Sequence, residues 1–185
     1  GQSLSSIVGR GDLIRKIRIP RWIIIVSSSI SALINLALNL LVIGVFVVLG
    51  GVDIRMSVLW LPLILLEIYV LALGVSLILS AAYVKYRDIS YIWDVLIQAG
   101  FYLTPILYPL SIISNVTYQK IILLNPMAQT VQDARYALVT PDTLTISSVF
   151  GSWAYRLIPI SIVLVILVAG VLYFKKQAKD FAENL

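Results

Sequence analysis

The chain has 185 residues, of which 60% are hydrophobic and only 12% are charged, and a water-soluble domain of this size cannot bury so much apolar surface. Its net charge is +5 and its mean hydropathy is +0.98. Cysteine and histidine are absent, which excludes disulfides and thiolate metal sites and weighs against a membrane-embedded metalloenzyme. The composition therefore indicates an integral membrane protein.

Four apolar stretches are expected to cross the bilayer, which takes roughly 20 residues of helix. They run over residues 22–50, 57–84, 92–109 and 157–174, and the third contains Pro105. Helix is the expected state because lipid offers the backbone no hydrogen-bond partner, and barrel strands would alternate in polarity. The predicted fold class is therefore an all-α integral membrane protein with four membrane-spanning helices in this chain.

The segment between the third and fourth stretches, residues 110–155, has a different character. It holds two short apolar pieces, 118–124 and 127–139, separated by Asn125-Pro126. Neither piece can span a bilayer, and pieces of this length suit re-entrant or interfacial helices. We therefore expect two such helices near the outer face.

Positive charge is unevenly distributed between the two sides of the predicted bundle, and this asymmetry sets the orientation. One side holds both chain ends and ten basic residues: Arg10, Arg15, Lys16, Arg18, Arg21, Lys85, Arg87, Lys175, Lys176 and Lys179. The other side holds four: Arg55, Lys120, Arg135 and Arg156. Both ends are therefore predicted to be cytoplasmic.

Residues 10–21 form a basic segment with one apolar helical face. Its basic residues include Arg15, Lys16 and Arg18, and Pro20 follows them. One interpretation is a juxtamembrane helix held by anionic lipid, at about 1 kcal/mol per basic residue. The other is a short helix that docks a partner protein.

A second basic segment, residues 83–89, joins the second and third stretches on the same side. It contains Lys85, Arg87 and Asp88. By itself it reads as a tight interfacial turn with Asp88 as the N-cap of the next helix.

Polar residues within the spans need partners. A stripe at spacings of three and four follows the first span: Ser28, Ser31, Asn35 and Asn39. Glu67 lies ten residues into the second span, about 15 Å along the helix and near mid-depth by this measure. An intramembrane acid is a candidate functional residue. The alternative, which we expect, is a structural hydrogen bond from Glu67 to Asn39 or another residue of the stripe.

Two further patterns concern packing and the path through the membrane. Small residues at Ala72, Ser76 and Ser80 predict a seam where another helix approaches closely.

Among the aromatic residues, Phe101, Tyr102 and Tyr108 lie along the third stretch. They suit either an interfacial aromatic belt or a path along which a polar polymer slides.

Four motifs in order resemble one family. They are residues 13–21, 85–89, 104–109 (TPILYP) and 124–126 (LNP), separated by the predicted spans. Together they resemble the permease subunit of type-2 ABC exporters, and most closely the polysaccharide export permeases for O-antigen, capsule or teichoic acid chains. The resemblance covers essentially the whole chain.

The resemblance implies a single permease domain over residues 1–185, with 10–21 as a coupling helix that docks an ATPase and 85–89 in a second cytoplasmic connection. Its channel path would include Phe101, Tyr102, Pro105 and Tyr108, and its outer-mouth segment would include Tyr118, Asn125, Pro126 and Tyr136. Such permeases usually have six membrane helices, so the leading helix and the first spans are expected to precede Gly1.

The expected partners are a cytoplasmic ABC ATPase, a second permease copy in a homodimer, a lipid-linked glycan and the bilayer, with no nucleic acid. The sequence has no phosphate-binding loop, so ATP and magnesium are expected on the ATPase and no cofactor on this chain. The permease itself would not be an enzyme, and it would lie in a bacterial or archaeal plasma membrane.

Two alternatives remain open. A drug or lipid exporter permease of the same superfamily would favour a drier, more apolar cavity. A membrane-embedded transferase acting on lipid-linked sugar would need converging acids and bases. The external segment offers Asp133, Asp142, Lys120, Arg135 and Arg156 for that role, and no histidine.

The charge asymmetry generates a test of topology. With single cysteines introduced at Ser114 and at Lys179, an impermeant thiol reagent added to intact cells should label position 114 and leave position 179 unlabelled. The opposite labelling pattern would show that the orientation is inverted.

Overall fold

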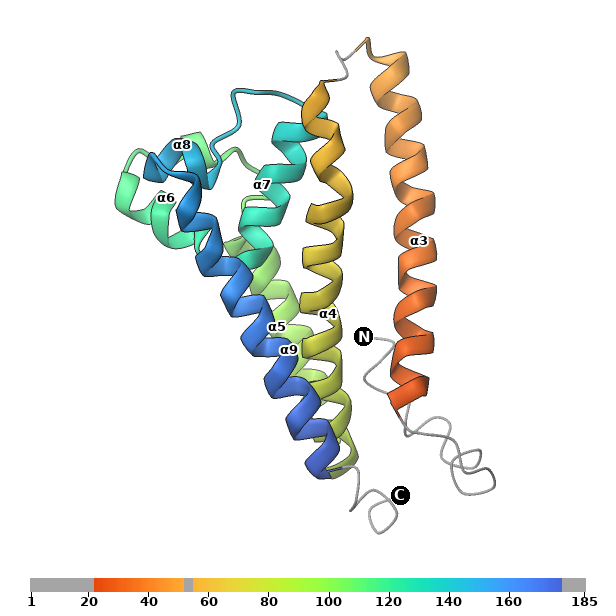
Figure 1. Cartoon of the computed structure of the whole chain (residues 1–185). Helices are drawn as coiled ribbons and strands as arrows, with labels where there is room; N and C mark the ends of the chain where they lie inside the picture. Colours follow the sequence, from red (N-terminus) through yellow and green to blue (C-terminus); the bar gives the residue numbers. More distant parts are fainter. Residues whose placement is uncertain (1–21, 52–54, 178–185) are drawn as a thin grey trace.

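The computed structural model describes residues 22–51 and 55–177, and every regular element within them is helical. The helices, labelled as in Figure 1, are α3 (Trp22–Leu49), α4 (Leu61–Lys85), α5 (Ile89–Leu103), α6 (Val116–Leu123), α7 (Pro126–Leu138), α8 (Ile146–Phe150) and α9 (Leu157–Gln177). Three 3₁₀ helices complete the order: η2 (Met56–Trp60), η3 (Leu110–Ile112) and η4 (Trp153–Arg156). The predicted all-α fold class is confirmed.

Some predictions fall on residues that the structure does not describe. The basic segment with Arg15, Lys16, Arg18 and Pro20 is one of them, and both chain ends are others. Their roles and the side on which they lie stay predictions.

Three helical stretches are long and apolar enough to cross a membrane: Val26–Leu49, Met56–Lys85 and Trp153–Gln177. The apolar helix α5 has 15 residues, so it is about 22 Å long and shorter than a hydrocarbon core of about 30 Å. The described part of the chain therefore has three full spans and one shorter membrane helix.

Helix α5 begins at Ile89 and ends at Leu103, whereas the sequence predicted residues 92–109. Its end follows from Pro105, because a proline disfavours helical backbone in the residue before it. Thr104 accordingly has extended backbone, with φ −88° and ψ 132°. Asp88 occupies the N-cap position as predicted, but its side chain makes no capping hydrogen bond.

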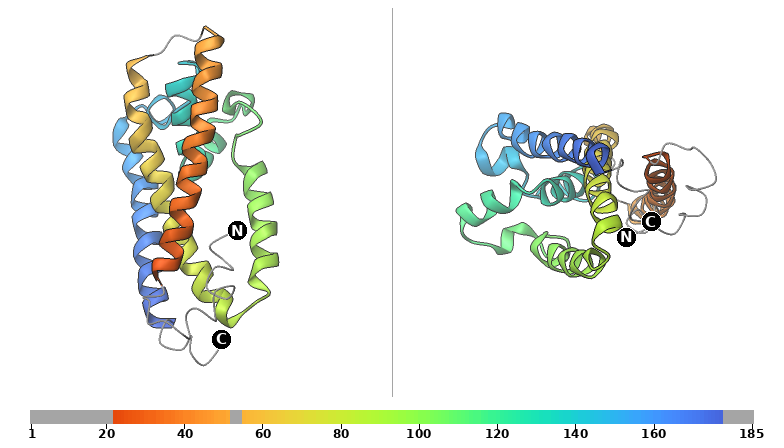
Figure 2. Two further views of the ribbon diagram at one scale, coloured as in Figure 1. Left: turned by 90° about the vertical axis from the view of Figure 1, so that its right-hand side faces the viewer. Right: turned by 90° about the horizontal axis from the view of Figure 1, so that it is seen from below.

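Helix α4 is the centre of the bundle and packs against α9, α7, α3 and α5 (Figure 1). Helix α3 stands to one side of α4, and α5 lies on another side, as the two views of Figure 2 show. We call the end where α6, α7 and α8 gather the cap end. The opposite end, which holds Lys85, Lys175 and Lys176, is the lysine end.

The closest helix contact joins α4 and α9 through two glycines. A Cβ atom added to Gly170 would lie 2.5 Å from the carbonyl oxygen of Gly74, and one added to Gly74 would lie 2.9 Å from the backbone of Leu167. Hydrogen at these positions lets the two backbones approach. Of the predicted seam, Ser80 is buried and Ser76 half-buried, but Ala72 is exposed, and the closest approach uses Gly74 in its place.

The cap end has a small apolar core of its own. Leu110, Leu123 and Ile146 are buried together and join η3, α6 and α8. Between α6 and α7 the chain turns at Asn125, whose side-chain oxygen accepts a hydrogen bond from the Met127 backbone N–H at 3.0 Å. Pro126 starts α7 at a position where a missing N–H costs nothing. The predicted break between two short helices is therefore present.

The glycine contact generates a stability test. Gly170→Ala should lower the unfolding free energy by about 1–3 kcal/mol, the usual cost of overpacking. Gly100→Ala is the matched control, because a Cβ at Gly100 meets nothing within 4 Å. Thermal unfolding of both variants in detergent measures the difference. Equal stability of the two would show that α4 and α9 do not depend on this contact.

Candidate functional site: a buried polar network around helix α7

Helix α7 carries several buried polar side chains. Gln129 and Gln132 are each 1% exposed, and Asp133 is 4% exposed. Gln129 and Asp133 are four residues apart and so share one helical face, whereas Gln132 and Arg135 share the neighbouring one. The helix therefore presents two polar faces inside an apolar bundle.

The first polar face of α7 meets α4 and α9. The Gln129 side-chain N–H donates to Asp133, and also to the carboxylate of Glu67 on α4 over 3.5 Å. The Arg156 guanidinium, at the end of η4 and directly before α9, donates to Asp133 in an ion pair. These residues are distant in sequence, so the network fixes α7 against both of the long helices.

The predicted partner of Glu67 is wrong. Asn39 instead donates to the backbone carbonyl of Asn35 on its own helix, at 2.8 Å, and both residues are exposed. Glu67 turns to Gln129 on α7. The depth estimate also changes, because 18 residues, or about 27 Å of helix, separate Glu67 from Lys85. Along α4, Glu67 therefore lies closer to the cap end than to the lysine end.

Helix α3 meets α4 through a polar contact beside the predicted stripe. The hydroxyl groups of Ser29 and Tyr69 lie 3.1 Å apart, within hydrogen-bond distance. Ser29 is one residue away from Ser28, so the helix is rotated relative to the sequence-based expectation. The sequence could have suggested Tyr69 as a hydrogen-bonding residue between helices, since a buried tyrosine hydroxyl usually finds a partner.

The second polar face of α7 holds the chain that follows α5. The Gln132 side chain donates to the carbonyl of Pro105 at 3.3 Å. The Arg135 guanidinium donates to the carbonyls of Ile106 at 2.8 Å and Tyr108 at 3.4 Å. Ending α5 at Leu103 leaves these carbonyls outside a helix, so the side chains of α7 satisfy them.

The predicted path residues Phe101 and Tyr102 lie together at the end of α5. Both are exposed, and their rings meet edge to face with centroids 5.8 Å apart. The Tyr108 hydroxyl donates to the Tyr102 carbonyl at 3.4 Å, so Tyr108 belongs to the same group. Pro105, by contrast, is buried.

Sequence reasoning missed a polar stripe on α5. Ser90, Asp94, Gln98 and Tyr102 are spaced by four residues and therefore follow one face of the helix. Asp94 and Gln98 are exposed, and α5 has no buried residue at all. An exposed acid cannot face lipid at low cost, so this face requires water or another polar surface. The spacing of four was visible in the sequence.

The other predicted site residues are spread over both ends. At the cap end, Tyr118 and Tyr136 are exposed, while Asn125 caps α7. At the lysine end, Lys85 lies over the Tyr86 ring at 5.5 Å, within the turn that also holds Arg87 and Asp88. The structure does not bring these two groups together.

The network around α7 leaves two buried atoms unpaired within the described residues. They are one carboxylate oxygen of Glu67 and the side-chain oxygen of Gln129. No group of three or more acidic residues in the same part of the chain could hold a metal ion. The arrangement therefore supplies hydrogen bonds and one ion pair between helices.

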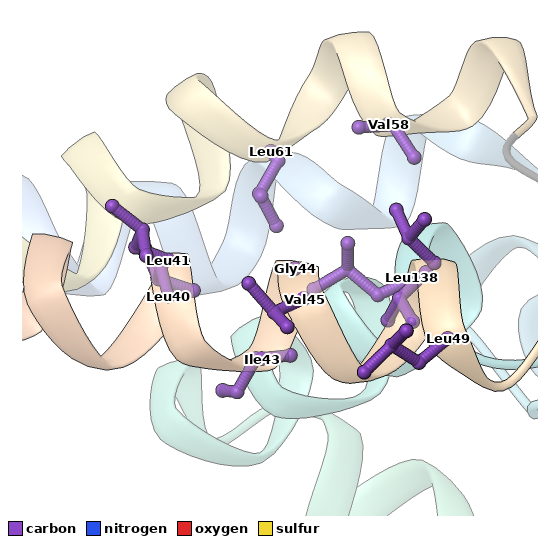
Figure 3. A pocket seen from close by; sticks show the side chains of 11 residues that line it. Leu40, Leu41, Ile43, Gly44, Val45, Leu49, Val58, Leu61 and Leu138 are labelled. Carbon is purple, nitrogen blue, oxygen red and sulfur yellow. The ribbon is translucent and has the colours of Figure 1, made fainter.

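An apolar cavity of about 590 Å³ lies between α3, α4 and α7 (Figure 3). Helix α3 supplies most of its lining, from Leu40 to Leu49. Val58, Leu61 and Leu138 close the other side. This cavity offers no hydrogen-bonding side chain and suits an acyl chain or another apolar group.

The fold and its network define a multi-pass helical membrane protein in which buried side chains join α7 to α4 by a hydrogen bond and to Arg156, just before α9, by an ion pair. The family model described as ABC-2 type transporter matches residues 2–139. The chain belongs to this family, which confirms the resemblance drawn from its motifs.

Several curated proteins are similar over nearly the whole chain. The O-antigen export system permease protein RfbA of Myxococcus xanthus is 29% identical over 189 residues, which cover 100% of this chain and 69% of that protein. Two proteins of the same name from Klebsiella pneumoniae are 28% and 27% identical over 186 residues, covering 99% of this chain and 68% of theirs.

The pairing of Glu67 with Gln129 generates a mutational test. Glu67→Gln keeps a side-chain oxygen for the bond and should leave stability nearly unchanged. Glu67→Leu should cost about 1–3 kcal/mol, because it leaves buried polar groups of the network without a partner. Unfolding of both variants, alone and combined with Gln129→Leu, measures this. Strictly additive losses in the combined variant would show that the two side chains do not interact.

Proposed function

We propose that this chain is the membrane-spanning half of an ATP-driven exporter of lipid-linked polysaccharide. The observation that carries the proposal is the similarity to three O-antigen export permeases over 99–100% of the chain. Membership of the ABC-2 family and three long apolar helices support the same conclusion. In this proposal the permease carries out no covalent chemistry.

The transport path is proposed to run along α5. Its stripe of Ser90, Asp94, Gln98 and Tyr102 offers hydroxyl, carboxylate and amide groups that can hydrogen-bond to sugar hydroxyls. Phe101, near the cap end of this helix, and Tyr108, in the chain that follows it, offer aromatic faces that can contact sugar rings. A polymer needs many weak contacts of this kind, because it must slide past each one.

The remaining partners follow from the proposed transport cycle. A separate ATPase would bind ATP and magnesium and would dock at the lysine end, on residues 10–21 and on Lys85, Arg87 and Asp88. That end would be cytoplasmic, in a bacterial or archaeal plasma membrane. A second copy of the permease would complete the path and cover the exposed face of α5, and no nucleic acid takes part.

The apolar cavity favours a second candidate, a drug or lipid exporter of the same family. Its lining residues, from Leu40 to Leu138, provide no polar contact for a sugar. Purified full-length permease with its ATPase, reconstituted in liposomes, separates the two candidates. Lipid-linked polysaccharide should stimulate ATP hydrolysis and accumulate on the opposite side. Stimulation by apolar drugs or free lipids alone would contradict the proposal.

The proposed path generates a prediction for the aromatic residues. Tyr102→Ala and Tyr108→Ala should slow polysaccharide export by roughly twofold to tenfold, since one aromatic contact contributes about 0.5–1.5 kcal/mol. Tyr91→Ala is the matched control at the other end of α5, where the ring is exposed. Export rates are compared at equal expression. Equal rates for all three variants would return these rings to a simple interfacial role.

A further inference from the structure

Helix α7 connects the helix pair α4 and α9 to the chain that follows α5. Its residues Gln129, Gln132, Asp133 and Arg135, which we call the α7 strut, bond to different elements on its two polar faces. One face holds α4 and α9, and the other holds the chain after α5. The strut is therefore a polar link between the long helices and the end of α5.

Helix α5 itself has no buried residue, and the first buried apolar residues after it are Pro105 and Leu110. Its neighbour α4 joins it through the short turn after Lys85, at the lysine end. After Leu103 the chain is held by the hydrogen bonds from Gln132 and Arg135 to the carbonyls of residues 105, 106 and 108. Three of the hydrogen bonds that hold this end of α5 therefore come from α7.

The position of α7 depends in turn on a charged contact. Asp133 is almost fully buried and pairs with Arg156, whose side chain is 22% exposed. The pair joins two residues that lie 23 positions apart in sequence, on two different elements. An ion pair between separate helices fixes their relative position only while both charges stay in contact.

The network is not completely paired in this arrangement. One oxygen of Glu67 and the oxygen of Gln129 are buried without a hydrogen-bond partner in the described residues. A network that serves only to hold a rigid core is normally satisfied throughout, because each unpaired buried group is unfavourable. The unpaired atoms lower the cost of leaving this arrangement for another one.

We propose that Asp133 and Arg156 are positioning residues for transport, which set the place of α5 through the α7 strut. Separation of the pair releases α7, and with it the cap end of the helix along which the path runs. This role rests on the proposed function only in taking α5 as the wall of the path. The mechanical link itself is independent of the cargo.

The test measures distances in the full-length permease assembled with its ATPase. Spin labels are attached to cysteines introduced in pairs, since this sequence contains no cysteine. One pair, Leu103 with Leu172, reports on α5 relative to α9, and the control pair, Leu66 with Leu172, reports on α4 relative to α9. All three positions are exposed. Pulsed electron paramagnetic resonance gives the distribution of each distance.

Arg156→Gln should broaden the 103–172 distribution and add a longer distance, while the 66–172 distribution stays unchanged. Arg135→Gln should have the same effect with the Asp133–Arg156 pair intact, which keeps the test informative if the first variant folds poorly. Arg156→Lys should leave the original distribution unchanged, because it retains the positive charge. Arg55→Gln, an exposed arginine at the same end, is the matched control and should change neither distance.

Unchanged 103–172 distances in both Arg156→Gln and Arg135→Gln would overturn the proposal. So would equal broadening of the two pairs, since that indicates general loosening rather than release of α5. The readout requires no transported substrate. If the distances respond as expected but the permease moves a different cargo, the strut is supported and only the proposed function fails.

Discussion

The structure depends on one constraint, which is that lipid satisfies no polar group. A buried amide or charge within the bundle is therefore stabilised only by partners on another part of the chain. Helix α7 meets this requirement by placing Gln129 and Asp133 toward α4 and α9, and Gln132 and Arg135 toward the carbonyls after α5. These polar side chains thus fix the position of α7, which is too short to cross the membrane.

The contact between α4 and α9 follows from a different part of the same constraint. Hydrophobic burial provides little drive for helices to associate within lipid, so close backbone packing takes its place. Gly74 and Gly170 permit this approach. The polar network lies above the glycine contact, toward the cap end, and α7 joins the two helices there. Backbone packing and buried polar contacts therefore hold different levels of one helix pair.

Local features of the sequence predicted much of the fold. Long apolar runs identified the spans, and the Asn125-Pro126 break between α6 and α7 was visible because capping and proline effects act over a few residues. Side-chain pairing was harder to predict. Glu67 and Gln129 are 62 residues apart, and nothing in either local sequence selects one partner over Asn39. The motifs predicted the family, but the ion pair of Asp133 with Arg156 required the structure.

The central claim is that the Asp133–Arg156 pair holds α7 in place, and a double-mutant cycle tests it most directly. Unfolding free energies are measured for Asp133→Asn, Arg156→Gln and the combined variant. Arg156→Gln should cost about 3–5 kcal/mol, because it leaves the buried charge of Asp133 unpaired. Asp133→Asn should cost less, because the Arg156 side chain is 22% exposed. The combined variant should lose much less than the sum, with an interaction energy of about 0.5–3 kcal/mol or more. Losses that add to within about 0.5 kcal/mol would show that the two residues do not interact and would contradict the account.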